Sequence, residues 1–270
     1  GKRIVLGGKF DQVHRNTPFR AWVDAFREFV RFVLVQSEEE VASWKREIDD
    51  LVGAGAIVLN QLVPHMENII GPRPPVDKLV GVELLHRFEA VMIRFLHVFA
   101  KKGLPVTFVL DDMQWADPAS ARLLVTVLGR DDLTHVRLIG AFRDHAEERG
   151  RLWDDTLRQL EAFGDRVGHI RLEPMRAAEI AQWLADTLHC EPAAVSAWAD
   201  RLEERTGGNP LFLQEYLRTL HAEQRVRYDA DAGRWVWDQR EAEAEAAAAY
   251  AHVGDLLLAR LRGVSPGGMR

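Results

Sequence analysis

Residues 104–124 read LPVTFVLDDMQWADPASARLL, and this stretch decides the fold that we expect. Residues 106–110 form a short apolar run rich in β-branched and aromatic side chains, which is typical of a strand buried on both faces of a parallel sheet. Asp111 and Asp112 follow at once. Asp117 then predicts a helix start, because aspartate caps helices and the proline after it suits the first helical position. The order of these signals places both acids at the carboxyl edge of a sheet, where open α/β folds bind ligands.

An apolar strand that ends in Asp-Asp is the Walker B pattern. In that pattern the first acid, here Asp111, holds Mg²⁺, and the second, Asp112, polarises the attacking water. The competing interpretation is a buried strand that ends in two solvated acids at a turn. The stretch alone does not separate the two interpretations, so the rest of the chain has to decide between them.

Composition and charge exclude several classes of protein. The chain has 270 residues, of which 47% are hydrophobic and 28% charged, and its formal net charge is −6. This balance argues against nucleic acid or an anionic membrane as a direct partner. The single cysteine, Cys190, excludes an internal disulfide framework and a multi-cysteine zinc site, and it fits the cytoplasm. No apolar run approaches the ~20 residues that a membrane helix needs.

A glycine-rich stretch near the start, Gly7-Gly8-Lys9, invites a phosphate-loop interpretation that the next residues exclude. A phosphate loop requires G-x-x-x-x-G-K followed by a serine or threonine that opens a helix. Here Phe10 follows the lysine, and Asp11 would repel phosphate. The full pattern occurs nowhere in the sequence. We therefore expect the chain to be a piece of a longer protein that begins after its phosphate loop.

Alternating apolar patterns predict an α/β core followed by a helical region. In the core we expect strands and helices to alternate, which favours a three-layered parallel sheet. The predicted core strands lie at residues 3–6, 106–110, 136–142 and 169–172, and the predicted helices at 18–35, 38–52, 82–100 and 152–163. After Pro174 the pattern predicts helices at 177–188, 192–205 and 210–223, a hairpin at 225–237, an exposed helix or linker at 241–250, and a helix at 253–261.

Five blocks appear in an order that resembles the signal-transducing AAA+-like ATPases called STAND NTPases. The likeness is strongest to the ATPase module found in large bacterial signalling kinases and transcriptional regulators, and it covers nearly the whole chain. The blocks are GKFDQ (8–12), VTFVLDDMQWADPAS (106–120), LIGAFRD (138–144), TGGNPLFL (206–213) and RWVWD (234–238).

The resemblance implies roles for three charged residues and for two cofactors. It implies that Asp111 is the Mg²⁺-associated acid, that Asp112 orients the attacking water, and that Arg143 is the sensor arginine that reads the γ-phosphate of ATP. A guanidinium at the end of a neighbouring strand can reach developing phosphate charge. The alternative for Arg143 is a salt bridge with Asp144 or Asp112.

The resemblance also implies that Gly208, Asn209 and Pro210 match the family's Gly-x-Pro turn, which lies near the nucleotide base. The alternative for these three residues is a plain turn between two helices, since Gly207 can end one helix in a left-handed conformation. Asparagine can then cap the next helix, and proline suits its first position.

The expected organisation is a P-loop NTPase-like core at residues 1–174 that lacks Walker A, a helical lid at 175–223, and a hairpin plus helix at 224–270. This last part would begin a further, winged-helix-like domain. The implied function is an ATP-dependent signalling switch, with ATP and Mg²⁺ as cofactors. Its output would be a linked effector domain such as a kinase, a cyclase or a DNA-binding domain.

Two other functions remain open at this point. The chain is alternatively a nucleotide-independent scaffold or interaction module. A metal hydrolase that uses Asp111 and Asp112 directly is a third hypothesis, but the sequence offers no additional ligands for it. Because the phosphate loop and the first strand of the sheet are expected before Gly1, we also expect the chain alone neither to hydrolyse ATP nor to fold robustly.

Overall fold

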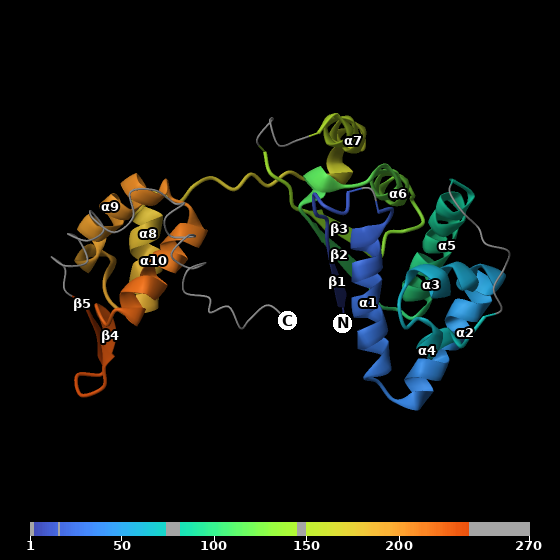
Figure 1. Ribbon diagram of the computed structural model, residues 1–270, viewed down its shortest axis with the longest axis horizontal. Coiled ribbons are helices and arrows are strands. Elements are labelled where there is room, and N and C mark those ends of the chain that lie inside the picture. The colour runs from blue at the N-terminus through green and yellow to red at the C-terminus, as the bar shows by residue number, and fades with distance from the viewer. Residues whose placement is uncertain (1–2, 16, 74–81, 145–149, 238–270) are drawn as a thin grey trace. The chain divides into compact units, whose positions relative to one another are not determined.

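The computed structural model describes residues 3–15, 17–73, 82–144 and 150–237 (Figure 1). The chain divides into two compact units, the first ending at His169 and the second beginning at Ile170. The segments at 241–250 and 253–261 lie outside the described residues.

The first unit contains a sheet of three parallel strands in the order β1-β2-β3. The strands are β1 (Ile4–Lys9), β2 (Val106–Asp111) and β3 (Val136–Gly140). The apolar run of the opening stretch is thus the middle strand, and the α/β class with a parallel sheet is confirmed. The register places Lys9, the last residue of β1, beside Asp111, the last residue of β2.

Helix α1 (Arg20–Leu34) covers one face of this sheet. Its Trp22 and Phe26 rings lie 5.3 Å and 5.8 Å from the ring of Phe108, which is fully buried in β2. Gly8 makes the close approach possible, because a Cβ at that position would lie 2.0 Å from the backbone carbonyl oxygen of Ala21. The Gly-Gly pair therefore serves helix–sheet packing within a strand, not a phosphate loop.

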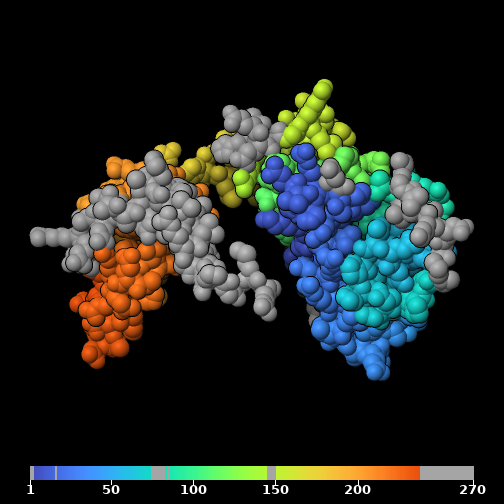
Figure 2. All heavy atoms as spheres, in the orientation of Figure 1, coloured from blue at the N-terminus to red at the C-terminus, as the bar shows by residue number. Residues whose placement is uncertain are grey.

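Six further α-helices complete the described part of the first unit. They are α2 (Glu38–Val52), α3 (Ala56–Leu62), α4 (Glu67–Ile70), α5 (Val82–Lys101), α6 (Pro118–Leu128) and α7 (Arg151–Glu161). In Figure 2 the side chains of α1 to α4, coloured blue to cyan, form one continuous mass. Beneath that surface the rings of Phe29, Trp44, Phe95 and Phe99 meet edge to face, with centroids 5.1–5.7 Å apart.

Helix α2 begins and ends where the sequence predicts. The Ser37 hydroxyl accepts a hydrogen bond from the Glu40 amide at 3.3 Å, and Gly53 follows the helix with a positive φ of 57°. The Glu40 carboxylate does not reach back to the cap as a capping box requires, because it pairs with Lys102 of the turn after α5.

The opposite face of the sheet carries no helix among the described residues. Val5 is 60% exposed and Ile139 is 55% exposed on this face, although Thr107 between them is buried. The three-layered arrangement is therefore wrong for the described part of the first unit. The physical reason is that α1, α5 and α6 pack against one another on a single side of the sheet (Figure 1).

The strand expected at residues 169–172 is also wrong. This segment is free of regular secondary structure, and Ile170 and Leu172 are 90% and 89% exposed. The alternating apolar pattern favours an extended backbone, but a strand also needs a hydrogen-bonded partner. None of the described strands pairs with it.

The described part of the second unit contains three α-helices and a hairpin around a core of its own. The elements are α8 (Ala177–Leu188), α9 (Ser196–Thr206), α10 (Pro210–Ala222), β4 (Val226–Asp229) and β5 (Arg234–Trp237). The predicted hairpin is confirmed, and the Trp237 ring stacks on the buried Trp198 ring of α9 at 6.5 Å. The helix expected at 192–205 begins later, because residues 192–194 form a short 3-10 turn before α9.

No helix in the described ranges of either unit combines the length and the apolar character that crossing a membrane requires.

Candidate functional site

A tight turn follows β2 and fixes the orientation of both acids. The Asp111 Oδ1 atom accepts a hydrogen bond from the Asp112 amide at 2.8 Å. Asp112 itself adopts a left-handed backbone, with φ 53° and ψ 41°, which aspartate tolerates better than most residues. The Met113 amide then donates to the Ala141 carbonyl at 3.0 Å, which ties this turn to the chain after β3.

Lys9 joins the two acids from the neighbouring strand. Its Nζ atom lies 3.0 Å from Asp111 Oδ2 and 2.9 Å from Asp112 Oδ2. The hydrogen bond from Lys9 is the main reason why the pKa of Asp112 falls below its ordinary value, and both carboxylates raise the pKa of Lys9 in return. A single ammonium therefore compensates two neighbouring negative charges.

Gln114 connects this pair to the third predicted residue. Its buried side chain donates to Asp112 Oδ1 at 3.2 Å and accepts from the Arg143 amide at 3.2 Å. The charge of Arg143 also contributes to the lowered pKa of Asp112. The structure thus brings Asp111, Asp112 and Arg143 to one edge of the sheet, as the sequence predicts.

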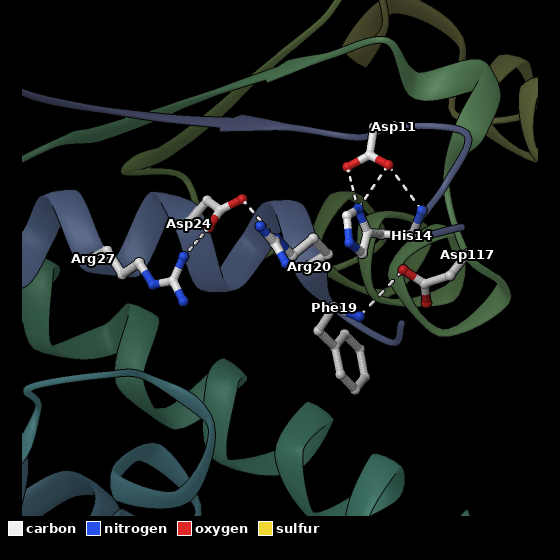
Figure 3. Close-up of polar contacts among 7 residues, drawn as sticks. All are labelled: Asp11, His14, Phe19, Arg20, Asp24, Arg27 and Asp117. Atoms are coloured by element: carbon white, nitrogen blue, oxygen red, sulfur yellow. Dashed lines mark hydrogen bonds and ion pairs between the residues drawn. The ribbon is translucent and has the colours of Figure 1, made fainter. Parts of the chain in front are cut away.

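Asp117 ends the turn and anchors two helices. Its Oδ1 accepts from the amides of Ala119 and Ser120 at 3.0 Å and 2.9 Å, which caps α6 as predicted. Its Oδ2 accepts from the Ser120 hydroxyl at 2.6 Å and from the Phe19 amide at 3.1 Å, the link drawn in Figure 3. The same buried carboxylate therefore also fixes the start of α1.

The glycine turn, residues 206–210, lies in the second unit between α9 and α10. Gly207 ends α9 in the predicted left-handed conformation, with φ 57° and ψ 25°. Gly208 has φ 71°, and a Cβ there would lie 2.1 Å from the Met175 carbonyl oxygen. The Met175 amide donates to the Gly208 carbonyl at 2.9 Å, so the turn holds the chain that leads into α8.

The last two residues of the glycine turn start α10. Asn209 Oδ1 accepts from the Leu211 amide at 2.9 Å, and Pro210 occupies the first helical position. These contacts supply a structural role for each residue that the resemblance associates with the nucleotide base.

Sequence reasoning missed Lys9 and Gln114 as members of the site. Both lie in the blocks that carry the resemblance, GKFDQ and DDMQWAD. The available signal for Lys9 was its place at the end of a strand that neighbours β2 in a parallel sheet. Gln114 gave no comparable signal. Its role depends on how close the segment after β2 lies to the segment after β3, because it links Asp112 to Arg143.

The two acids fit a hard cation that takes only some of its ligands from the protein. Asp111 and Asp112 each direct one oxygen at the point that the Lys9 ammonium occupies. Mg²⁺ commonly takes one or two protein carboxylates and completes its shell with water and phosphate oxygens. Within the described ranges there is no group of three or more histidine, cysteine or acidic residues that could hold a metal alone.

Comparison with known proteins relates the chain to a signalling kinase and to an ATPase family. The chain is 23% identical over 298 residues to the Dictyostelium discoideum protein named hybrid signal transduction histidine kinase G, an alignment that covers 86% of the chain. The chain spans only 8% of the length of that kinase. No solved structure matches the chain. Residues 1–139, just over half of the 270, match the family described as AAA ATPase domain, and the chain belongs to this family.

Proposed function

We propose that the chain is the nucleotide-controlled switch of a larger cytoplasmic signalling protein, in which ATP binding and slow hydrolysis set the state of a linked effector domain. One observation carries the proposal: Asp111 and Asp112 aim one oxygen each at a common cation, at the edge of the sheet that also holds Arg143. Membership of the AAA ATPase domain family supports ATP as the nucleotide. The similarity to a signalling kinase supports a role beside effector domains.

In this proposal each charged residue has one task. Asp111 holds Mg²⁺, which when bound neutralises phosphate charge. Asp112 orients the attacking water, and Gln114 keeps its carboxylate in place. Arg143 stabilises negative charge on the γ-phosphate, and its backbone is held by the same glutamine.

Tight nucleotide binding also requires phosphate-cradling amides and a lysine. We place this phosphate-binding segment on the outer edge of β3. Among the described strands β3 pairs only with β2, and Ile139 on it is exposed. At the other edge of the sheet the Gly7 amide already donates to the Glu28 carboxylate at 2.5 Å, which discourages pairing there.

The proposed domain layout keeps residues 1–174 as the core, 175–223 as the lid and 224–270 as the start of a further domain. Gly208, Asn209 and Pro210 would contact the base and pass its presence to the lid. The hydrogen bond between Gly208 and Met175 supports this coupling, because it makes the turn and the chain entering α8 move together. A switch of this kind works only if nucleotide binds its two states with different affinity.

Nucleotide binding and turnover by the full-length gene product test the proposal. Calorimetry with Mg²⁺ and ATP should show binding that Asp111→Ala plus Arg143→Ala weakens strongly. Asp112→Asn should keep binding and lose phosphate release by about 100-fold or more, as expected for a residue that activates water. Asp165→Asn removes an exposed acid elsewhere in the same unit and should change neither quantity. Unchanged binding in the double variant would count decisively against the switch.

A second candidate, a nucleotide-independent interaction module, is favoured by the uncovered face of the sheet. Val5 and Ile139 expose more than half of their surface there, and one edge of β3 is shared with no other strand that the structure describes. The two candidates differ in one measurement. A full-length protein that binds no ATP, yet loses effector output when Ile139 is changed to Lys, would support the module over the switch.

A further inference from the structure

The Lys9 ammonium lies between Asp111, the acid to which the proposed function assigns Mg²⁺, and Asp112, the acid that it assigns to the attacking water. Lys9 and Asp111 are register partners at the ends of adjacent parallel strands, so their side chains leave the same face of the sheet. The ammonium is within 3.0 Å of an oxygen from each acid. The register of β1 and β2 therefore builds this contact directly into the fold.

The other oxygen of each acid is already engaged by the protein. Asp111 Oδ1 accepts from the Asp112 amide, and Asp112 Oδ1 accepts from Gln114. Only the two Oδ2 atoms face Lys9. The two Oδ2 atoms are therefore the oxygens that a cation from solvent can bind without sharing an oxygen that already accepts a hydrogen bond within the turn.

The contact is accessible to solvent and thus exchangeable. The Lys9 side chain is 62% exposed and that of Asp111 is 50% exposed. An exposed ion pair contributes little stability and breaks readily, since water screens its charges. A lysine side chain also has four rotatable bonds, which allow the ammonium to leave without movement of the backbone.

We propose that Lys9 is a built-in counter-cation that competes with a divalent cation for the Oδ2 atoms of Asp111 and Asp112. Without metal, the ammonium compensates the repulsion between the acids and keeps them aimed at one point. With metal, it has to leave, so Lys9 sets the metal concentration at which the site fills. This inference rests on the proposed function, because it takes Asp111 as the metal-holding acid. It adds that Asp112 offers a second oxygen to the same cation.

Binding of Mn²⁺ alone to the 270-residue chain tests the competition. Free Mn²⁺ gives an electron paramagnetic resonance signal that falls on binding, and no nucleotide is needed. Lys9→Met keeps an unbranched side chain that is one atom shorter and removes its charge. We expect it to bind Mn²⁺ about tenfold tighter or more, as the loss of one positive charge close to a divalent cation implies. Lys9→Arg should bind no more tightly than the wild type.

Two controls separate a local effect from a general one. Lys45→Met makes the same change in net charge at an exposed lysine of α2 and should leave Mn²⁺ affinity unchanged. Asp111→Asn should abolish the binding that Lys9→Met strengthens. Melting temperature gives a second readout: Mn²⁺ should raise it more in Lys9→Met than in the wild type. Lys9→Gln replaces Lys9→Met if the latter does not fold.

The outcomes distinguish this inference from the proposed function. Equal Mn²⁺ affinity in the wild type and Lys9→Met, with loss in Asp111→Asn, would overturn the competition and leave the metal site standing. A gain in Lys45→Met as large as in Lys9→Met would overturn it too, because net charge alone would explain the result. No Mn²⁺ binding in either protein would overturn the competition, and the proposed function would then depend on nucleotide binding by the full-length protein. Tighter binding in Lys9→Met alone supports the competition, whether or not the full-length protein hydrolyses ATP.

Discussion

The acid turn (residues 111–117) and the glycine turn (206–210) are built from the same local parts. Each contains a left-handed backbone, at Asp112 in the first and at Gly207 in the second. Each ends in an N-cap residue with a short side chain, followed by proline at the first helical position. Both turns therefore start a helix, α6 or α10, by the same mechanism.

The two turns differ in where their polar groups point. In the glycine turn Gly208 and Asn209 form hydrogen bonds with the protein's own backbone and with the nearby Thr206 hydroxyl. In the acid turn Asp111 and Asp112 direct oxygens toward an exposed ammonium from another strand. Folding thus explains the residues of the glycine turn, whereas it does not explain why two carboxylates should gather at the edge of the sheet. The acid turn carries the stronger indication of a ligand.

The largest effect should come from breaking the close approach in the glycine turn. In Gly208→Ala the new Cβ would fall 2.1 Å from the Met175 carbonyl oxygen, so the backbone has to shift. We expect a loss of about 3 kcal/mol or more in the free energy of unfolding, in the range of severe overpacking. Chemical denaturation followed by tryptophan fluorescence measures it, because Trp198 lies in the core of this unit.

Gly207→Ala is the matched control for the stability loss in Gly208→Ala. Gly207 has a similar positive φ, but a Cβ there meets nothing within 4 Å. It should cost only about 1 kcal/mol, from the left-handed backbone alone. Equal costs at the two glycines would show that the contact with Met175 is not what requires glycine.

The next effect concerns the cap of the acid turn. Asp117→Ala removes the acceptor for the Phe19 amide as well as for the amides of Ala119 and Ser120, in a buried place. We expect a loss of about 2–3 kcal/mol, since an ordinary cap is combined with a buried amide left without its partner. Thermal unfolding of the first unit measures it. A loss under 1 kcal/mol would mean that water replaces the carboxylate and that Asp117 does not anchor α1.

The elements that were predicted correctly are those whose signals are local. Asp117 and Asn209 cap their helices as expected, because a cap depends on the two or three residues that follow it. Strand β2 formed as predicted, because a short apolar run rich in β-branched residues is typical of a strand buried inside a parallel sheet. Asp111, Asp112 and Arg143 met because the carboxyl ends of parallel strands share one edge.

The parts that were missed depend on contacts between distant residues. Lys9 is 102 positions from Asp111, and only the register between β1 and β2 brings them together. The segment at 169–172 has the alternation of a strand but no partner among the described strands. Gly208 was identified as part of a turn, but its contact with Met175 could not be read from the turn alone.

A smaller effect should follow from the cap of the glycine turn. Asn209→Ala removes the hydrogen bond that its side chain accepts from the Leu211 amide, and water can replace that acceptor at this exposed position. We expect a loss of about 1 kcal/mol, less than at Asp117. Asn209→Asp should retain most of the stability, because aspartate caps as well as asparagine. Full stability in Asn209→Ala would show that the proline and the fold of α10 suffice to start the helix.

The smallest effect separates the two turns by their response to acid. Because Lys9 lowers the pKa of Asp112 in the folded chain below its ordinary 3.8, this carboxylate stabilises the fold at neutral pH. That contribution is lost as the pH falls through the lowered pKa, when the folded state takes up the proton as well. Asp112→Asn should therefore lose less stability than the wild type between neutral pH and about pH 3. The difference should be under about 1 kcal/mol, because water screens the exposed Lys9 of this pair. Asn209→Ala, which changes no titratable group, should shift urea denaturation curves equally at both pH values. An acid response in Asp112→Asn identical to that of the wild type would mean that the link to Lys9 carries no stability, and that the two turns differ in charge but not in energetics.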